Sequence, residues 1–296
     1  MRDGSVHRAR PFSIFDHARS VDDSATFFMS RSMHATPELP RPADLLVVGH
    51  VTRDLVAGEE RLGGAASYAA LAAASRGLIV ELVTVGPSHW TLLAPILTHP
   101  NIRATVLPAD VPTTFRLVYE SGARSVFRHA LAPSIDVPGT TCPVVYLAPV
   151  AGEIAPDAAL RFGRDAFVVA GLQGWMRAVD EAGRVRAIDP PQLHGIHAAI
   201  LSEHDHPRAD ALAAELARGI AVVVVTRGAR GATVYADRRS VDVPAFPANE
   251  VDPTGAGDVF GVVLALGLAT GKSPVDAATE AAFVAARSVE HVGVGS

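Results

Sequence analysis

Runs of β-branched residues alternate with Ala-rich stretches along most of the chain. Residues 45–49 (LLVVG) have the uninterrupted apolar pattern of a buried strand, residues 63–77 continue from paired glycines into an Ala-rich helix, and residues 78–86 form the next apolar strand. Uninterrupted apolar strands are buried on both faces, so this order of strand, helix and strand predicts a parallel sheet with helices on both faces. Further strands are expected at residues 144–150, 165–171, 184–189, 198–203 and 220–228.

One segment departs from this pattern. Residues 113–130 alternate apolar and polar positions around Gly122, and glycine readily adopts the positive φ that a tight turn requires. The alternation predicts a β-hairpin that projects from the sheet as a small accessory element. A helix-rich region follows Gly255 and includes residues 273–292. The expected fold class is therefore α/β, with a mostly parallel central sheet and one β-hairpin outside it.

Composition divides the chain near residue 44. Residues 1–43 mix Arg, His, Asp, Ser and Pro, which predicts a flexible N-terminal extension. The same segment also fits a translation start assigned too far upstream, since Met29 and Met33 are alternative starts. Residues 44–296 hold all the predicted strands and helices, and the chain is 49% hydrophobic, so we expect them to fold as one domain.

Charge and cysteine content exclude several classes of function. The 26 Lys and Arg residues against 31 Asp and Glu residues give a net charge of −5, which supplies no basic field for a nucleic-acid backbone. The single cysteine, Cys142, can neither close an internal disulfide nor form a thiolate zinc site, which fits a reducing cytoplasm. The longest apolar stretch, residues 259–269, is shorter than the about 20 residues that span a bilayer. We therefore expect a cytoplasmic protein without nucleic-acid or membrane partners.

The segment with the most chemical information is residues 250–271 (EVDPTGAGDVFGVVLALGLATG). Gly255, Ala256 and Gly257 are small enough for their backbone N–H groups to point at one bound group, and Asp258 then begins an apolar helix. Amides at a helix N-terminus bind anions, and the helix dipole adds to this. An Asp beside such a site can accept a proton from a hydroxyl that attacks phosphorus. The local chemistry predicts phosphoryl transfer to an alcohol; the alternative is a tight loop in which Asp258 caps the helix.

The string DPTGAGDVF, residues 252–260, closely resembles the C-terminal signature of the ribokinase (PfkB) family of sugar kinases, and other family motifs precede it in the family's order from Asp44 onward. The resemblance implies a ribokinase-like fold and a phosphotransferase that uses ATP and Mg²⁺ to phosphorylate a hydroxyl of a small sugar or polyol. It also implies that Asp258 is the general base and that the hairpin of residues 113–130 is a lid over the acceptor.

Near the N-terminus, GHVTRDL followed by LGGAASYAA resembles the family's first strand and its double-glycine substrate motif. The resemblance implies that Asp54 accepts hydrogen bonds from two acceptor hydroxyls and that Gly63 and Gly64 present bare backbone to the ring. Tyr68 flanks this motif and is a further candidate substrate contact. Only eight residues separate Asp54 from Gly63, which we consider too few for lid strands, so the lid is expected mainly from residues 113–130.

The donor and metal residues follow from the same resemblance. Thr226, Gly228 and Gly231 in VVVVTRGARG match the family's nucleotide-binding turn, where glycines let the backbone approach phosphates or ribose. The motif that organises Mg²⁺ appears as Ser202-Glu203-His204-Asp205, so Asp205, with Glu203 as an alternative, is the expected metal contact. Asp252 matches a position that supplies oxygen to a monovalent cation such as K⁺ in relatives, and it is the third candidate metal residue.

Three functions remain open at this point. The first is an ATP-dependent kinase of a sugar or polyol, with a polyol such as inositol favoured because GGAASYAA is similar to that branch of the family. The second is a nucleoside kinase, which would need an aromatic pocket near Tyr68 to stack a base. The third is a catalytically silent sugar-binding protein of the same fold. A homodimer that forms through the lid is a further expectation from the resemblance.

Overall fold

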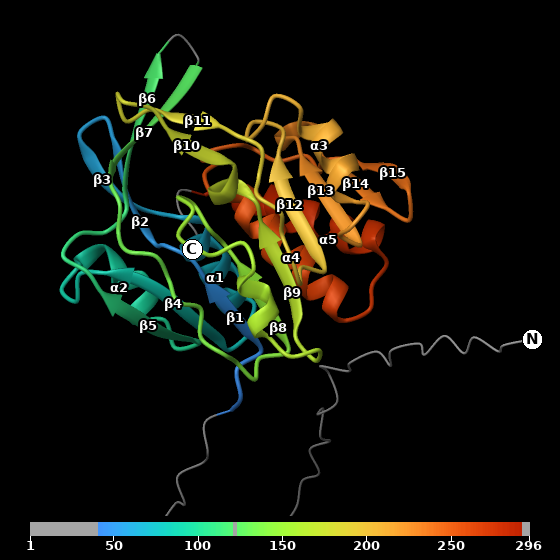
Figure 1. Cartoon of the computed structure of the whole chain (residues 1–296), viewed down its shortest axis with the longest axis horizontal. Coiled ribbons are helices and arrows are strands. Elements are labelled where there is room, and N and C mark those ends of the chain that lie inside the picture. The colour runs from blue at the N-terminus through green and yellow to red at the C-terminus, as the bar shows by residue number, and fades with distance from the viewer. Residues whose placement is uncertain (1–40, 121–122, 292–296) are drawn as a thin grey trace, which may run out of the picture.

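The structure, a computed structural model, describes residues 41–120 and 123–291. The predicted N-terminal extension therefore lies outside the described residues, apart from its last three. The centre of the molecule is a nine-stranded sheet in the order β15-β14-β13-β12-β9-β8-β1-β4-β5 (Figure 1). Its strands are β1 (Leu45–Val48), β4 (Val80–Gly86), β5 (Ile102–Pro108), β8 (Val144–Leu147), β9 (Phe167–Gly171), β12 (Ala198–Ser202), β13 (Val222–Thr226), β14 (Ala232–Ala236) and β15 (Arg239–Val243).

The sheet is parallel from β5 to β13, as the sequence pattern predicts, and antiparallel at the other edge. Strand β13 joins β14 through the 3₁₀ turn η4 (Gly228–Arg230), and β14 joins β15 through Asp237 and Arg238, which both have positive φ. Connections this short permit only antiparallel neighbours, because a parallel pair needs a crossover of a dozen or more residues. The predicted strand at residues 184–189 lies outside this sheet, as β11 (Val185–Ala187) paired with β10 (Arg177–Val179).

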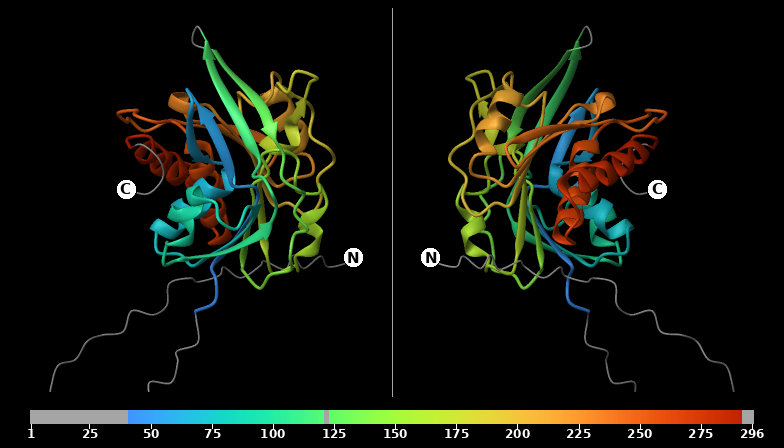
Figure 2. Two further views of the ribbon diagram at one scale, coloured as in Figure 1. Left: turned by 90° about the vertical axis from the view of Figure 1, so that its left-hand side faces the viewer. Right: turned by 90° about the vertical axis from the view of Figure 1, so that its right-hand side faces the viewer.

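Side chains on the two faces of the sheet enter two separate cores. In β1, Leu45 and Val47 belong to one core, while Leu46 and Val48 belong to the other. Such alternation along an apolar strand requires cover on both sides. Figure 2 shows the C-terminal helices on one side and the segment before β9 on the other. The first core takes residues of α1 (Ala65–Ser75), η1 (Thr91–Leu93), α2 (Ala94–Leu97), α4 (Ala256–Ala269) and α5 (Pro274–Ser288), and the second those of η2 (Ala158–Arg161), η3 (Gln173–Met176) and α3 (Ala209–Leu216). None of the helices in the described part of the chain is long and apolar enough to cross a membrane.

A second sheet of four strands, called the lid sheet below, stands above the carboxyl ends of the central strands (Figures 1 and 2). Its order is β3-β2-β6-β7, with β2 (Thr52–Val56), β3 (Glu59–Gly63), β6 (Thr114–Glu120) and β7 (Ala123–Ala130). The hairpin predicted at residues 113–130 is therefore confirmed. The expectation that too few residues precede Gly63 for lid strands is wrong. Ala57 at φ 50° and Gly58 at φ 88° form a two-residue turn, and this turn leaves the flanking residues free to pair as β2 and β3.

The β10–β11 hairpin closes one edge of the lid sheet within the same chain. The backbone N–H of Arg128 on β7 donates to the carbonyl of Gly183 at 2.8 Å, and Phe127 forms a β-bridge with Arg184. The lid sheet has two edge strands, β7 and β3, and these contacts cover the outer edge of β7. A second subunit that added a strand to the lid sheet would therefore pair with β3. The lid-mediated homodimer stays a prediction.

A buried histidine joins the lid sheet to the central sheet. His50 follows β1 and is fully buried; its Nε2 lies 2.9 Å from the carbonyl of Pro133, and its Nδ1 lies 2.8 Å from Oγ1 of Thr113, just before β6. A carbonyl only accepts, so Nε2 donates to Pro133, and Nδ1 forms a second hydrogen bond with the Thr113 hydroxyl. The hydroxyl oxygen in turn accepts from the N–H of Ala132 at 2.9 Å. Both ends of the β6–β7 hairpin are thereby fixed to the end of β1.

Candidate active site

The residues singled out by their motifs gather where the parallel strands end. Leu147 and Val48 are register partners at the ends of β8 and β1, and Ser202 and Thr226 are partners at the ends of β12 and β13. The motifs for acceptor, metal and donor therefore leave the sheet at the same edge. In open parallel sheets this edge is where ligands bind.

Helix α4 begins at the expected glycine-rich turn. Gly255 has φ 80°, a left-handed conformation that a side chain would strain, and a Cβ there would overlap the ring of Tyr68. Before it, Asp252 Oδ1 accepts the N–H of Thr254 at 3.0 Å, which holds the DPTG turn. Glycine at this position is thus required by backbone conformation and by the close approach of Tyr68.

The first turn of α4 uses some of its amides internally. The N–H groups of Asp258 and Val259 both donate to the carbonyl of Gly255 at 2.9 Å, and Ala256 N lies 3.3 Å from the carbonyl of Pro253. Among the described residues, the Gly255 and Gly257 amides make no such bond. A Cβ at Gly257 would meet no atom within 4 Å, so this glycine borders open space. The predicted anion site is therefore narrowed to the amides of Gly255 and Gly257, next to Asp258.

A buried tyrosine lies beneath Asp258. Tyr146, on β8, is 1% exposed, and its hydroxyl lies where a Cβ at Gly261 of α4 would overlap it. Burial raises the pKa of this phenol well above its ordinary value, and the negative charge of Asp258 raises the pKa further. The phenol therefore stays neutral under all ordinary conditions. Packing of Tyr146 against Gly261 positions the first turn of α4 over the end of β8.

The predicted acceptor residues lie together at the base of the lid sheet. Thr52 donates its hydroxyl to Asp54 Oδ1 at 2.8 Å, which orients that carboxylate. A Cβ at Gly63 would overlap the Asp54 carboxylate, and one at Gly64, where φ is 93°, would overlap the carbonyl of His50. Both glycines are therefore required by the close approach of residues 50–54 to the segment that enters α1.

Tyr68 connects the acceptor group to the start of α4. Its hydroxyl donates to the carbonyl of Leu62 at 3.3 Å, and its ring lies against Gly255. One side chain of α1 therefore touches the turn that carries the predicted anion site. The structure brings together the predicted acceptor residues and the predicted catalytic turn, which are about 200 residues apart in the sequence.

The predicted donor turn has the expected backbone. Gly228 has φ 55° and would place a Cβ in open space, whereas a Cβ at Gly231, with φ 89°, would overlap the carbonyl of Val243. Gly231 is thus needed to fit η4 against the end of β15, and Gly228 is needed for its left-handed conformation. Thr226 Oγ1 lies 3.5 Å from the carbonyl of Leu201, on the neighbouring strand.

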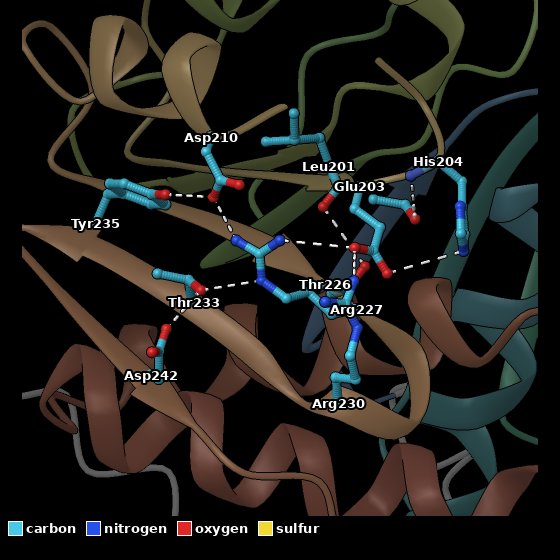
Figure 3. A network of polar contacts seen from close by, with 11 residues as sticks. Leu201, Glu203, His204, Asp210, Thr226, Arg227, Arg230, Thr233, Tyr235 and Asp242 are labelled. Atoms are coloured by element: carbon cyan, nitrogen blue, oxygen red, sulfur yellow. Dashed lines mark hydrogen bonds and ion pairs between the residues drawn. The ribbon is translucent and has the colours of Figure 1, made fainter. Parts of the chain in front are cut away.

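Two arginines of this turn take part in a network of charges that the sequence did not reveal (Figure 3). Arg227 pairs with Asp210 of α3 and lies 3.7 Å from Glu203, while Arg230 pairs with the same Glu203. The Tyr235 hydroxyl donates to Asp210 at 2.5 Å. This hydrogen bond, followed by that from Arg227, lowers the pKa of Asp210, and burial with the bond to Asp210 raises the pKa of Tyr235 to about 12.

The three candidate metal residues lie apart and have protein partners. Glu203 is bound to the arginines, Asp252 to its own turn, and Asp205 accepts the Ser202 N–H at 2.8 Å and the Gln173 amide at 3.1 Å. The described ranges contain no group of three His, Cys, Asp or Glu side chains that could hold a metal. Mg²⁺ commonly keeps water and substrate phosphates as ligands, and each Asp205 oxygen retains acceptor capacity. Asp205 therefore fits a Mg²⁺ contact made through water, which stays a prediction.

Two polar residues at this edge were missed from the sequence. Gln173 and Arg177 follow β9, in the segment GLQGWMR, where Gln173 positions Asp205 and Arg177 reaches the lid. For Gln173 the available signal was its place two residues after a buried strand, because polar residues at that point of a parallel strand commonly face a ligand. No motif marked them.

Comparison with known proteins shows similarity to carbohydrate kinases. The model of the pfkB family carbohydrate kinases matches residues 197–296. Inositol 3-kinase from Oryza sativa subsp. japonica is 33% identical over 279 residues, which cover 84% of this chain and 69% of that protein. Inositol 3-kinase from Arabidopsis thaliana is 29% identical over 284 residues, which cover 89% of this chain and 78% of that protein.

Solved structures share the fold at lower identity. A pyrophosphate-dependent kinase of the ribokinase family, complexed with a pyrophosphate analogue and myo-inositol, superposes with a TM-score of 0.71 at 18% identity over 84% of this chain and 96% of that one. Ribokinase from Arabidopsis thaliana, complexed with ribose and ATP, superposes with a TM-score of 0.65 at 18% identity over 86% and 95%. At this level of identity the likeness shows the fold alone.

Proposed function

This chain belongs to the PfkB family of carbohydrate kinases, and from that premise we propose that it transfers the γ-phosphoryl group of ATP to one hydroxyl of a cyclic polyol of the inositol type. Its relatives support a carbohydrate kinase that transfers phosphate to a hydroxyl. The inositol 3-kinases among them support the choice of acceptor. The donor and the role of each residue are our inferences from the site.

The proposed reaction needs one base and one set of donors. Asp258 takes the proton of the attacking hydroxyl, and the hydroxyl oxygen forms a bond to the γ-phosphorus as the bond from that phosphorus to the β-γ bridging oxygen breaks. The products are ADP, a phosphate monoester and a proton held first by Asp258. The amides of Gly255 and Gly257 lie next to Asp258 and would stabilise charge on the transferred group. Mg²⁺, when bound, neutralises phosphate charge, and Asp205 is the residue we expect to hold it through water.

The observation that carries the proposal is the contact of Tyr68 with Gly255. Through it the acceptor group around Asp54 and the turn before Asp258 form one site, which an in-line transfer requires. A nucleoside kinase is less well supported, because the Tyr68 ring packs against Gly255 and its hydroxyl is held by Leu62. One side of the ring is therefore already used within the protein, which disfavours a stack on a base.

Pyrophosphate is the alternative donor. Arg227 and Arg230 add two guanidinium groups to the donor turn, and such groups bind the phosphates of either donor. The positive φ of Gly228 and Gly231 lets the backbone of the turn approach a ribose as well as a phosphate. Pyrophosphate has no ribose, so this feature favours ATP, which is the donor we propose.

A screen of acceptors against both donors tests the function. With ATP as donor, we expect kcat/KM for myo-inositol to be at least about tenfold higher than kcat/KM for ribose, hexoses or nucleosides. A tenfold difference corresponds to one well-placed hydrogen bond to a charged group. ADP release would be measured for ATP and phosphate release for pyrophosphate. Turnover with pyrophosphate only would overturn the donor, and preference for a nucleoside would overturn the acceptor.

A further inference from the structure

We propose that Arg177 binds the acceptor and determines which hydroxyl of the polyol faces Asp258. This proposal rests on the proposed function and deepens it. Arg177 begins β10, directly after η3, and its side chain is half-buried. No feature of the amino-acid pattern pointed to it; its place follows from how the lid sheet meets the end of the central sheet.

Register places the Arg177 guanidinium on the same face of the lid sheet as Asp54. Asp54 on β2 and Phe115 on β6 are paired residues of neighbouring strands, so their side chains point to the same side. Phe115 is buried, and the guanidinium carbon of Arg177 lies 5.5 Å from the centre of its ring. This is within the range of a cation–π contact. The face of the lid sheet that carries the Asp54 carboxylate is therefore also the face that the Arg177 guanidinium contacts, through Phe115.

The backbone that carries Arg177 is rigidly held. Gly174 donates its N–H to the carbonyl of Pro149 at 2.9 Å, and a Cβ on Gly174 would overlap the Pro149 backbone. Trp175 donates its indole N–H to the carbonyl of Ile154 at 2.7 Å. Arg177 itself donates through Nη1 to the carbonyl of Val150 at 3.1 Å. A side chain fixed in this way loses little conformational entropy when a ligand binds.

The backbone segment that accepts the hydrogen bond from Arg177 is held in place by a buried glutamate side chain. Glu153 is 2% exposed and accepts the N–H groups of His50, Val150 and Ala151 at 2.8 to 3.1 Å. These bonds join the segment after β1 to the segment after β8. Because Val150 also holds Arg177, the guanidinium, the lid base and the central sheet keep one relative position.

Complementary charge explains why such a residue would select a hydroxyl. A carboxylate such as Asp54 only accepts hydrogen bonds, and a guanidinium such as Arg177 only donates them. A cyclic polyol carries similar hydroxyls all round its ring, each able to do both. A pocket with one acceptor and one planar pair of donors holds the ring in one orientation, whereas Asp54 alone permits several.

Replacement of Arg177 tests the proposal through binding and through the position of the phosphate in the product. Arg177→Met keeps the volume, and Arg177→Lys keeps the charge without the planar fork. We expect the Kd for myo-inositol, measured by calorimetry, to rise about 10- to 100-fold in Arg177→Met, the range for a hydrogen bond to a charged group. The KM for ATP should stay within about twofold, and NMR of the product should show more than one phosphorylated position. Arg177→Lys should recover part of the affinity but not the single product.

Arg186→Met is the matched control. Arg186 lies on β11 of the same hairpin, is 55% exposed and pairs with Asp180 at 2.9 Å, so its removal should change neither binding nor product. A purely structural role for Arg177 would lower thermal stability and leave the product position unchanged, which would overturn the proposal. Wild-type affinity and a single product in both Arg177 variants would also overturn it. Binding and phosphorylation of polyols by the wild-type protein are measured first. If the wild-type protein neither binds nor phosphorylates any polyol, the proposed function itself is contradicted.

Discussion

Asp258 is the residue on which the proposed chemistry depends. It lies in the first turn of α4, where the helix dipole favours a negative charge, and it stands next to the two glycine amides that we assign to the transferred phosphoryl group. A carboxylate at this place can accept a proton without being itself a phosphate ligand. Its replacement therefore separates proton transfer from binding.

We expect Asp258→Asn to lower kcat by about 10²- to 10⁴-fold, the usual range for a positioned general base, while the protein folds and binds ATP. The amide has nearly the same size as the carboxylate, so the melting temperature should change little. Steady-state kinetics and ATP titration measure both effects. A variant that keeps more than about a third of wild-type kcat would remove Asp258 from the role of base.

The two glycines before Asp258 should respond differently to a methyl group. A Cβ at Gly257 meets open space, so Gly257→Ala should keep its melting temperature and lose about tenfold or more in kcat by crowding the phosphoryl group. A Cβ at Gly255 meets Tyr68, and the left-handed conformation adds roughly 1–2 kcal/mol of strain. Gly255→Ala should therefore lower the melting temperature and weaken acceptor binding through Tyr68. Equal effects of the two variants on stability would contradict this distinction.

At the scale of elements, we propose that the lid sheet separates the acceptor from water. Four strands form it from two distant hairpins, and the β10–β11 hairpin supports its β7 edge. The inner face carries Asp54, Phe115 and the contact with Arg177. In the proposed function, the lid sheet is thus both a cover over the acceptor and a source of contacts to it.

Shortening the β6–β7 hairpin tests the cover alone. Replacing residues 118–125 by a short Gly turn keeps Phe115, Arg128 and the core residue Leu117 but removes the outer parts of β6 and β7, so water should reach the site. We expect the ratio of ATP hydrolysis to polyol phosphorylation to rise, measured as ADP formed against phosphorylated product. If the protein dimerises through the lid, light scattering should also show a smaller mass. An unchanged ratio would assign the cover to another segment.

At the scale of the whole molecule, a polar cluster contributes to stability at the antiparallel edge of the sheet. Tyr235 on β14, Asp210 on α3 and Arg227 after β13 connect three elements. The pKa of Tyr235 is raised to about 12, above its ordinary value of 10, because burial and the bond to Asp210 favour the neutral phenol. The pKa of Asp210 is lowered, first by the bond from Tyr235.

These pKa shifts predict that the cluster stabilises the fold only between an acidic and an alkaline limit of pH. The unfolded chain loses the Tyr235 proton near pH 10 and the folded chain only near pH 12, so the contribution of Tyr235 is present below pH 10 and is lost between these values. The contribution of Asp210 is present above its ordinary pKa of 3.8 and is lost as the pH falls through its lower folded value. Thermal unfolding of Tyr235→Phe should show a smaller fall in melting temperature from pH 10 to 12 than the wild type. Identical curves would contradict the assignment.

Local patterns were sufficient for much of this molecule. The sequence alone determined the order of buried strands and Ala-rich helices, the β6–β7 hairpin, and the motifs around Asp54, Thr226 and Asp258. Each of these depends on residues close together in the chain: apolar runs select buried strands, and glycines select turns. The family resemblance then assigned roles to those motifs.

Tertiary structure alone decided the contacts between distant segments. The pairing of β2 with β6, the contact of Tyr68 with Gly255, and the place of Arg177 beside Phe115 each join residues at least about 60 positions apart. The same holds for Glu153, whose carboxylate binds backbone N–H groups after two different strands. A local pattern states which face of a strand is apolar but not which strand lies beside it, because strand order and register arise from packing of the whole core. For this reason the sequence determined the motifs to which we assign the chemistry of transfer, and only the fold decided that Arg177, which we propose to hold the acceptor, lies beside the lid sheet.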